Sequence, residues 1–354
     1  MVNVKTIYET TRACVENARF ETDRISSLAD EVKVNLCARA DGKVTFNIVR
    51  FDNELNSKTV YTKELCADEQ GRVELEHTFD PVYLFVYESA RSFSFVIEGA
   101  SEITELTVVE GNNEAEQGKE VSRDNTGVDK DGNPIVYVKL LNGERAETRR
   151  IPRKALFAGN SLLLGIGYGM CSSAPDKDYY HYVSEHILSF NPDCKFGKLP
   201  GSVFERCESI EAFEGWYENH VYPQLSEDTD LIILQHGDNI GDEAKVLNFT
   251  KTKDLFIERL KKDVPYARII WVHGWYNKKL SGPYVNEVCD KWDIECIDIS
   301  SIRCRETEAH HQSEYFDIEE GKLKAVDKAW QTHPGDLGMK RIADRIIATL
   351  KLEN

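Results

Sequence analysis

A serine in a turn of small residues is the first feature of this chain that could do chemistry. Ser161 lies within residues 157–165 (FAGNSLLLG), after a run that predicts a short strand and at a point where a helix can begin. A hydroxyl at such a turn is exposed, and the serine's own N–H can point at a developing oxyanion. These are the requirements of an acyl-transfer nucleophile. A serine that only caps a helix would carry the same local pattern, so the segment alone leaves both interpretations open.

Two later segments could complete such a site. His333, in the segment THPGDLGM, directly precedes an amphipathic C-terminal stretch and is a candidate general base. Asn239, in the segment QHGDN, follows an apolar run that predicts a buried strand. Taken singly, His333 could instead cap a helix or lie in a core, and Asn239 could be an ordinary turn residue. The order serine, asparagine, histidine favours a shared site.

Four short blocks resemble the SGNH (GDSL-type) hydrolase superfamily. Ser161 matches the first block, Gly201 in LPGS the second, Asn239 in GDN the third and His333 the last. The resemblance extends over about residues 153–352. It implies that Ser161 is the nucleophile and His333 the base. It also implies that the oxyanion binds to the N–H groups of Ser161 and Gly201 and to the side-chain amide of Asn239.

The chain departs from the family pattern in two places. Ile240 follows Asn239, where many members have aspartate, and Trp330 stands three residues before His333, where the family usually carries the aspartate that orients the imidazole. Some members of the superfamily work with a Ser-His dyad, in which a backbone carbonyl orients the ring. The resemblance therefore implies that the Trp330 carbonyl orients His333. Asp327 and Asp336 are the nearby alternatives, and we expect Asp336 to cap the last helix.

The composition bounds the class of protein. At 354 residues, two domains are expected, and the formal charge of −17 argues against nucleic acid or an anionic membrane as a partner. Nine scattered cysteines without a Cys-x-x-Cys pair predict buried free thiols in a reducing compartment. The N-terminal residues carry no apolar signal core, so we expect a cytoplasmic protein. No cofactor is expected, and the oligomeric state stays open.

A metal site is not expected. His310 and His311 are the densest group of potential ligands, but adjacent residues point apart on a helix and to opposite faces of a strand. His236 and His273 each end an expected strand beside a glycine. Either one could line the pocket or serve a structural role.

Residues 1–150 predict a β-sandwich, resembling a jelly roll, with a polar linker after about residue 120. Short runs of alternating apolar residues are separated by turn residues, and Asp41-Gly42 between two of these runs predicts a hairpin. The expected strands are 32–37, 44–49, 73–77, 82–87, 93–97 and 105–109, followed by 135–140 at the end of the linker.

Residues 151–354 predict an α/β domain with a doubly wound parallel sheet, the flavodoxin-like SGNH fold. Short continuously apolar strands alternate with helical patterns, as in buried parallel sheets. Ligands bind such sheets at the carboxyl ends of the strands, where both Ser161 and Asn239 fall. The expected strands are 155–158, 231–235, 269–272 and 295–297, and the expected helices are 179–189, 209–220, 252–262, 284–292 and 339–352.

Together these features predict an SGNH-type serine esterase. The resemblance implies removal of a small acyl group, most simply acetyl, from a carbohydrate-like ester, because superfamily members with an added β-sandwich look like sugar deacetylases. The expected partner is therefore a small-molecule or oligosaccharide ester. Two alternatives stay open: a lipase or thioesterase with the same site, and a catalytically inactive carbohydrate-binding protein.

Overall fold

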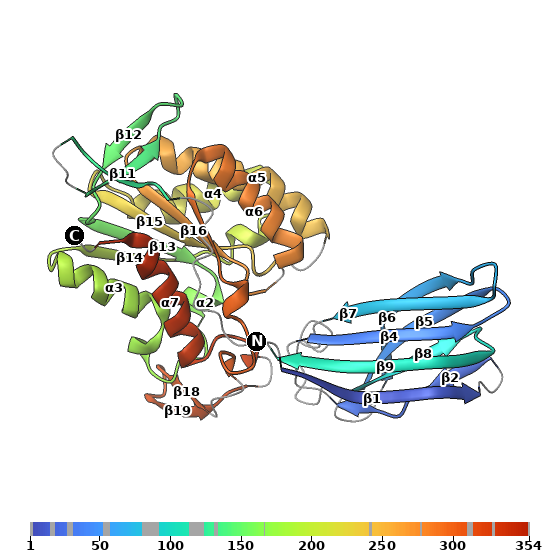
Figure 1. Cartoon of the computed structure of the whole chain (residues 1–354). Coiled ribbons are helices and arrows are strands. Elements are labelled where there is room, and N and C mark those ends of the chain that lie inside the picture. Colours follow the sequence, from blue (N-terminus) through green and yellow to red (C-terminus); the bar gives the residue numbers. More distant parts are fainter. Residues whose placement is uncertain are drawn as a thin grey trace. The chain divides into compact units, whose positions relative to one another are not determined.

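The computed structural model divides the chain into two compact units (Figure 1). The first comprises Met1–Glu114 with Asp327–Thr332, and the second comprises Ala115–Val326 with His333–Asn354. The residues that the structure describes are 3–14, 18–26, 31–51, 57–79, 92–112, 124–130, 134–165, 167–240, 243–276, 278–309, 314–327 and 330–352.

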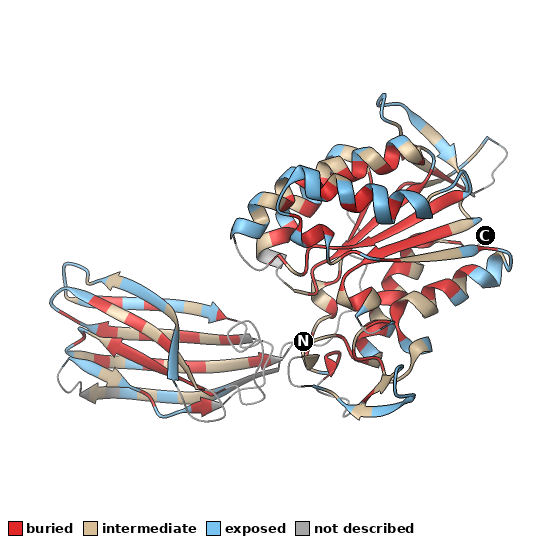
Figure 2. Cartoon of the chain, turned by 180° about the vertical axis from the view of Figure 1, so that it is seen from behind, coloured by how far each residue is buried: buried red, intermediate tan, exposed pale blue. Residues whose placement is uncertain are grey.

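The first unit is a β-sandwich, as predicted. Two antiparallel sheets, with strand orders β1-β9-β4-β7 and β2-β8-β5-β6, pack their inner faces into one core. Buried and exposed residues alternate along several strands, which places alternate side chains in that core (Figure 2). The strands are β1 (Asn3–Cys14), β2 (Arg19–Glu21), β3 (Ile25–Ser26), β4 (Glu31–Arg39), β5 (Lys43–Phe51), β6 (Ser57–Cys66), β7 (Arg72–Phe79), β8 (Ser92–Glu98) and β9 (Glu102–Asn112).

The hairpin predicted at Asp41-Gly42 is wrong. Strand β4 before this turn pairs with β7 and β9, whereas β5 after it pairs with β6 and β8. The turn therefore carries the chain from one sheet to the other. Residues such as Val34 and Phe46 on the two strands share the core between the sheets, so their burial comes from face-to-face packing. The strand predicted at 82–87 lies outside the described residues.

The second unit contains a five-stranded parallel sheet of order β14-β13-β15-β16-β17. In chain order this is second-first-third-fourth-fifth, which is the flavodoxin-like order, with its switch point between β13 and β15. The prediction of a doubly wound sheet is confirmed. Strand β14 was missed, because this edge strand is polar and only one of its residues is buried. The strands are β13 (Lys154–Gly159), β14 (Lys195–Pro200), β15 (Thr229–Gln235), β16 (Arg268–His273) and β17 (Glu295–Asp298).

Helices cover both faces of this sheet (Figure 1). On β13, Leu156 and Ala158 pack into the core that contains α4–α6, while Ala155 and Phe157 pack into the core that contains α2, α3 and α7. The predicted helices are confirmed, although α5 begins nine residues earlier than expected (243 against 252) and α4 ends early in a π-helical turn, Tyr217–Val221. The helices are α2 (Ser161–Leu164), α3 (Tyr179–Phe190), α4 (Ile210–Trp216), α5 (Glu243–Asp263), α6 (Lys278–Trp292) and α7 (Asp336–Leu350).

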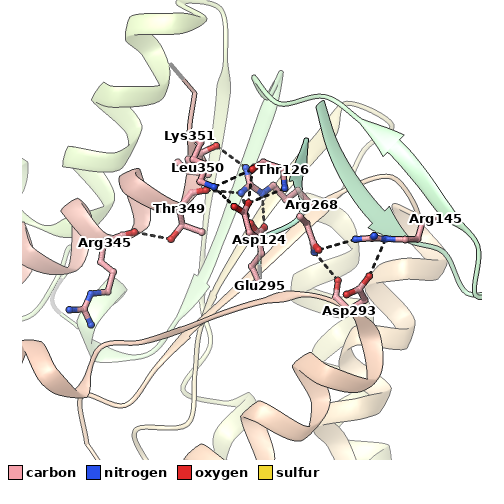
Figure 3. A network of polar contacts seen from close by, with 11 residues as sticks. Asp124, Thr126, Arg145, Arg268, Asp293, Glu295, Arg345, Thr349, Leu350 and Lys351 are labelled. Carbon is pink, nitrogen blue, oxygen red and sulfur yellow. Dashed lines mark hydrogen bonds and ion pairs between the residues drawn. The ribbon is translucent and has the colours of Figure 1, made fainter. Parts of the chain in front are cut away.

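The segment predicted as a linker belongs to the second unit. It forms a small antiparallel sheet of β10 (Thr126–Val128), β11 (Pro134–Lys139) and β12 (Arg145–Thr148). Thr148 Oγ1 donates to the Tyr266 carbonyl at 2.6 Å, and Lys139 Nζ donates to the Lys291 carbonyl at 2.9 Å. Figure 3 shows further ties, in which Asp124 pairs with Lys351 and Arg145 with Asp293. The division between the units therefore falls near residue 114, not residue 150.

Among the residues that the structure describes, no helix combines the length and the apolarity needed to cross a lipid bilayer. Eight cysteines with described side chains are free thiols, and six of them are buried.

A hairpin of β18 (Glu314–Asp317) and β19 (Lys322–Ala325) precedes α7.

Candidate active site

The turn from β13 into α2 places Ser161 at the carboxyl edge of the sheet. Asn160 is the N-cap residue, and its side-chain oxygen accepts a hydrogen bond from the Leu162 amide at 3.1 Å. Gly159 makes the turn sterically feasible, because a Cβ atom there would lie 2.9 Å from Cβ of Leu163. Ser161 is then the first helical residue, and amides in the first turn have no acceptor within the helix.

The Ser161 hydroxyl meets the imidazole of His333. Ser161 Oγ lies 3.0 Å from Nε2 of His333, and both residues are half-buried. The His333 carbonyl accepts a hydrogen bond from the Ala309 amide at 2.7 Å, which ties this loop to the segment after β17. The ring of Tyr276 packs edge-on against the imidazole, with centroids 5.6 Å apart. The two candidate residues therefore have the geometry of a nucleophile and its base.

This geometry excludes one of the two interpretations of Ser161, that of a helix cap. The capping role belongs to Asn160, so Ser161 is not a helix cap. Its hydroxyl instead faces His333, which lies in a loop and not in a core. The expectation that Asp336 caps the last helix is also wrong. Gly335 is the N-cap of α7, and Asp336 lies in the first turn.

The predicted oxyanion donors come near this turn, with one difference. Asn239 follows β15 across the switch point from Ser161, and its Nδ2 donates to Oε2 of Glu205 at 2.6 Å. The second Nδ2 proton can serve another acceptor. The Gly201 amide donates to the Gly159 carbonyl at 2.6 Å. An oxyanion would have to share that single proton, so the role of Gly201 stays a prediction.

Glu205 is a site residue that the sequence analysis missed. It is 3 % exposed, and it accepts hydrogen bonds from Asn160 Nδ2 at 3.3 Å, from the Gly237 amide and from both the amide and the side chain of Asn239. Burial, together with the charge of Asp238, raises the pKa of Glu205 to about 7, although the hydrogen bonds from these donors act to lower it. A glutamate four residues after a glycine carries no recognisable motif, so no local signal marks it.

A second buried carboxylate supports the same loops. Asp238 accepts a hydrogen bond from Gln235 Nε2 at 2.5 Å and from the Tyr276 amide at 2.6 Å. Burial raises the pKa of Asp238 to about 6. Gln235 in turn accepts from the Asn160 amide at 3.3 Å. Asp238 thus joins the ends of β15 and β16 to the loop that carries Ser161.

The two histidines that end strands have buried rings. His236 lies among Phe204, Phe256 and Trp271, and burial lowers its pKa to about 3, so it is neutral at ordinary pH. A Cβ atom added at Gly201 would overlap the His236 ring. This contact gives Gly201 a packing reason to be glycine. His273 at the end of β16 is equally buried.

The group that orients His333 stays a prediction. The Trp330 amide donates a hydrogen bond to the Asp327 carbonyl at 2.9 Å. The carboxylate of Asp336 accepts from the amide of Ser173 at 2.7 Å and from Lys177 Nζ at 3.1 Å. Asp336 therefore holds the loop before α3.

Two further features of the second unit bear on possible metal or ligand sites. Within the described part of the chain, no group of His, Cys, Asp and Glu side chains could hold a metal ion, and His310 and His311 lie outside it. A cavity of about 620 Å³ lies at the opposite edge of the sheet, between β12 and the starts of β13 and β15. Among its charged lining residues, Arg153 and Asp230 pair with each other at 3.0 Å.

Comparisons with known proteins give similarity only to solved structures. No protein-family model matches the chain, and no curated protein matches it. An acetyl xylan esterase from the rumen bacterium Butyrivibrio proteoclasticus is 12 % identical over 99 % of this chain and 98 % of its own, with a TM-score of 0.34. A family 2 carbohydrate esterase from Myceliophthora fergusii is 11 % identical over 99 % and 98 %, with a TM-score of 0.38. A GDSL-like lipase from Parabacteroides merdae is 11 % identical over 58 % and 98 %, with a TM-score of 0.39.

Proposed function

We propose that this protein is a serine esterase in which Ser161 is the nucleophile and His333 the general base. The observation that carries the proposal is the 3.0 Å approach of Ser161 Oγ to His333 Nε2 at the carboxyl edge of a doubly wound sheet. Because the Asn160 side chain caps helix α2, the Ser161 hydroxyl is not needed as the helix cap.

The chemistry is a two-step acyl transfer. His333 Nε2 takes the Ser161 proton as Oγ forms a bond to the ester carbonyl carbon, and the carbonyl oxygen becomes an oxyanion. The oxyanion accepts hydrogen bonds from the Ser161 amide and from the free Nδ2 proton of Asn239. When the C–O bond to the alcohol breaks, His333 returns its proton to the leaving oxygen. Water then attacks the acyl-enzyme with His333 again as base, releasing the acid and restoring Ser161.

We propose a small acyl group, most simply acetyl, on a carbohydrate-like alcohol as the substrate. The support is the resemblance of the sequence to two-domain SGNH sugar deacetylases. A chain-length series of p-nitrophenyl esters tests the acyl part of this proposal. A preference for acetate over octanoate supports it, while the reverse order favours the lipase or thioesterase alternative. Release of acetate from acetylated oligosaccharides tests the alcohol part.

Labelling with a fluorophosphonate probe tests the nucleophile. The wild-type chain should label at Ser161 and hydrolyse p-nitrophenyl acetate, and Ser161→Ala should lose both properties with an unchanged melting temperature. Ser189→Ala is the matched control, because Ser189 Oγ donates to the His186 carbonyl on helix α3 and it should label normally. A folded wild-type chain that neither labels nor hydrolyses esters would instead be a catalytically inactive binding protein.

A further inference from the structure

Glu205 joins the two loops on either side of the sheet's switch point. One of its oxygens, Oε1, accepts from Asn160 Nδ2 in the loop after β13 and from two amides in the loop after β15. The other, Oε2, accepts from Asn239 Nδ2 at 2.6 Å. A single buried carboxylate therefore contacts both the cap of the helix that begins with Ser161 and the candidate oxyanion donor.

The described residues give this carboxylate four hydrogen bonds, all from amide N–H groups. The orientation of Asn160 is independently set, because its side-chain oxygen accepts from the Leu162 amide and its NH₂ group must face Glu205. For Asn239 the carboxylate sets the orientation in its ionised form, because that form can only accept hydrogen bonds. With the Asn239 oxygen turned towards Glu205, two acceptors would face each other.

Glu205 differs in what it contacts from Glu295 and Glu308, two other buried acids of this unit. Glu295 pairs with Arg268 at 2.6 Å and Glu308 pairs with Arg303 at 2.8 Å. The hydrogen bonds to Glu205 within the described residues all come from neutral amides. A buried carboxylate without a cationic partner is costly, and an apolar residue would fill the site with less penalty. Such a cost is characteristic of groups that serve a site.

We propose that Glu205 is a positioning residue that orients the Asn239 side chain so that one Nδ2 proton is held and the other is presented to the oxyanion. The inference rests on the proposed esterase function. It assigns Glu205 no contact with the substrate. Its effect on catalysis must therefore pass through Asn239, and this requirement separates positioning from general structural support.

A double-mutant cycle tests that requirement. Glu205→Gln places an NH₂ group opposite Asn239 Nδ2 and should turn the Asn239 amide, so kcat on p-nitrophenyl acetate should fall about 10²–10³-fold with little change in KM. Asn239→Ala should have an equal effect. In the Asn239→Ala background, Glu205→Gln should cost less than about threefold more. If the kcat loss of the double variant equals the product of the two single losses, the proposal is overturned.

The matched control is Glu295→Gln, the same change at another buried acid. Glu295 begins β17 and so lies at the amino-terminal ends of the strands, away from the carboxyl ends where the candidate site lies. It should lower stability and leave kcat within about twofold. A kcat loss there equal to that of Glu205→Gln would show a general effect of removing buried acids and would overturn the proposal.

A measurement without substrate separates this inference from the esterase function. In the wild type, the Asn239 side-chain NH₂ signals should be resolved in NMR spectra and slow to exchange, and Glu205→Gln should abolish that protection. Unchanged signals would overturn the positioning role even in an active enzyme. A chain with no esterase activity and protected Asn239 signals would refute the function alone. If Glu205→Gln does not fold, Glu205→Gln with Asn239→Asp restores a donor facing an acceptor and should fold without activity. Failure of that pair to fold would overturn the proposal.

Discussion

Ser161 Oγ lies 3.0 Å from His333 Nε2, although the two residues are 172 positions apart in the chain. Ser161 begins helix α2 and His333 lies in a loop, and the parallel sheet brings both residues to its carboxyl edge. The adjacent residue Asn160 caps helix α2, so the serine hydroxyl is available to the histidine. This division of roles between neighbouring residues supports the proposal that Ser161 is the nucleophile.

The first prediction concerns the group that orients His333. If a backbone carbonyl does so, Asp327→Asn should change kcat by less than about tenfold. Neutralising an aspartate of a true triad costs about 10⁴-fold in kcat, so a loss of that size would establish a triad instead. Asp336→Asn is the companion variant. It should weaken the contacts to Ser173 and Lys177 and lower the melting temperature, with kcat per folded molecule retained.

The second prediction concerns the space at Gly201. Gly201→Ala should destabilise the chain by about 1–3 kcal/mol, because the new methyl group overlaps the buried ring of His236. Chemical denaturation measures the loss. The double variant Gly201→Ala/His236→Ala removes the overlap and should lose less than the sum of the two single changes.

Gly215→Ala is the matched control for this experiment. Gly215 lies exposed within α4, and apart from its chain neighbours and the backbone of its own helix no atom lies within 4 Å of where its Cβ would be. Alanine there should stabilise the chain by about 0.5–1 kcal/mol through helix propensity. Equal destabilisation by both alanines would mean that overlap with His236 is not the cause.

The third prediction is that His236 stays neutral. Burial lowers its pKa from the ordinary 6.5 to about 3. Between these values the unfolded chain binds a proton that the folded chain does not, so His236 opposes folding increasingly as pH falls from about 6.5 towards 3, by up to about 1.4 kcal/mol per pH unit. Imidazole NMR signals of His236 should show no titration between pH 8 and pH 5. A midpoint near pH 6.5 would contradict the buried environment.

The fourth prediction concerns Glu205, whose contribution to stability falls as the pH rises, the opposite of the pH dependence expected for His236. The pKa of Glu205 is raised from 4.5 to about 7, so its contribution to stability is fully present below about pH 4.5 and is lost as pH rises through about 7. Asp238, with a pKa of about 6, contributes with the same sign. The stability difference between wild type and Glu205→Gln, measured by urea unfolding at each pH, should therefore move against the wild type from pH 4.5 to 7. A difference that does not vary with pH would contradict the raised pKa.

The fifth prediction concerns the boundary of the second unit. A chain that begins at residue 115 should be more stable than one that begins at residue 151. The shorter chain lacks β11 and so loses the buried residues Ile135, Val136 and Val138. Thermal unfolding of the two truncated chains compares them directly. Equal melting temperatures would place the boundary at about residue 150, as the sequence alone predicts.

The periodicity of apolar residues predicted a β-sandwich for the first unit and alternating strands and helices for the second, although strands such as β1, β6 and β14 were not predicted. Continuous apolar runs such as 231–235 are typical of strands buried on both faces, and alternation with helical patterns specifies a doubly wound sheet. The positions of Ser161, Asn239 and His333 beside these elements then predicted one shared site at the carboxyl edge. Edge strand β14 escaped notice because its burial is slight and leaves no apolar pattern.

Tertiary structure alone decided the features that depend on partners distant in sequence. The Asp41-Gly42 turn is local, but whether it closes a hairpin depends on which strands β4 and β5 pair with. Similarly, Glu205 acquires its role only when folding places it between Asn160 and Asn239, which belong to different loops. Local propensity acts over a few residues, whereas strand pairing and the burial of a carboxylate are set by contacts that form only when the whole sheet is assembled.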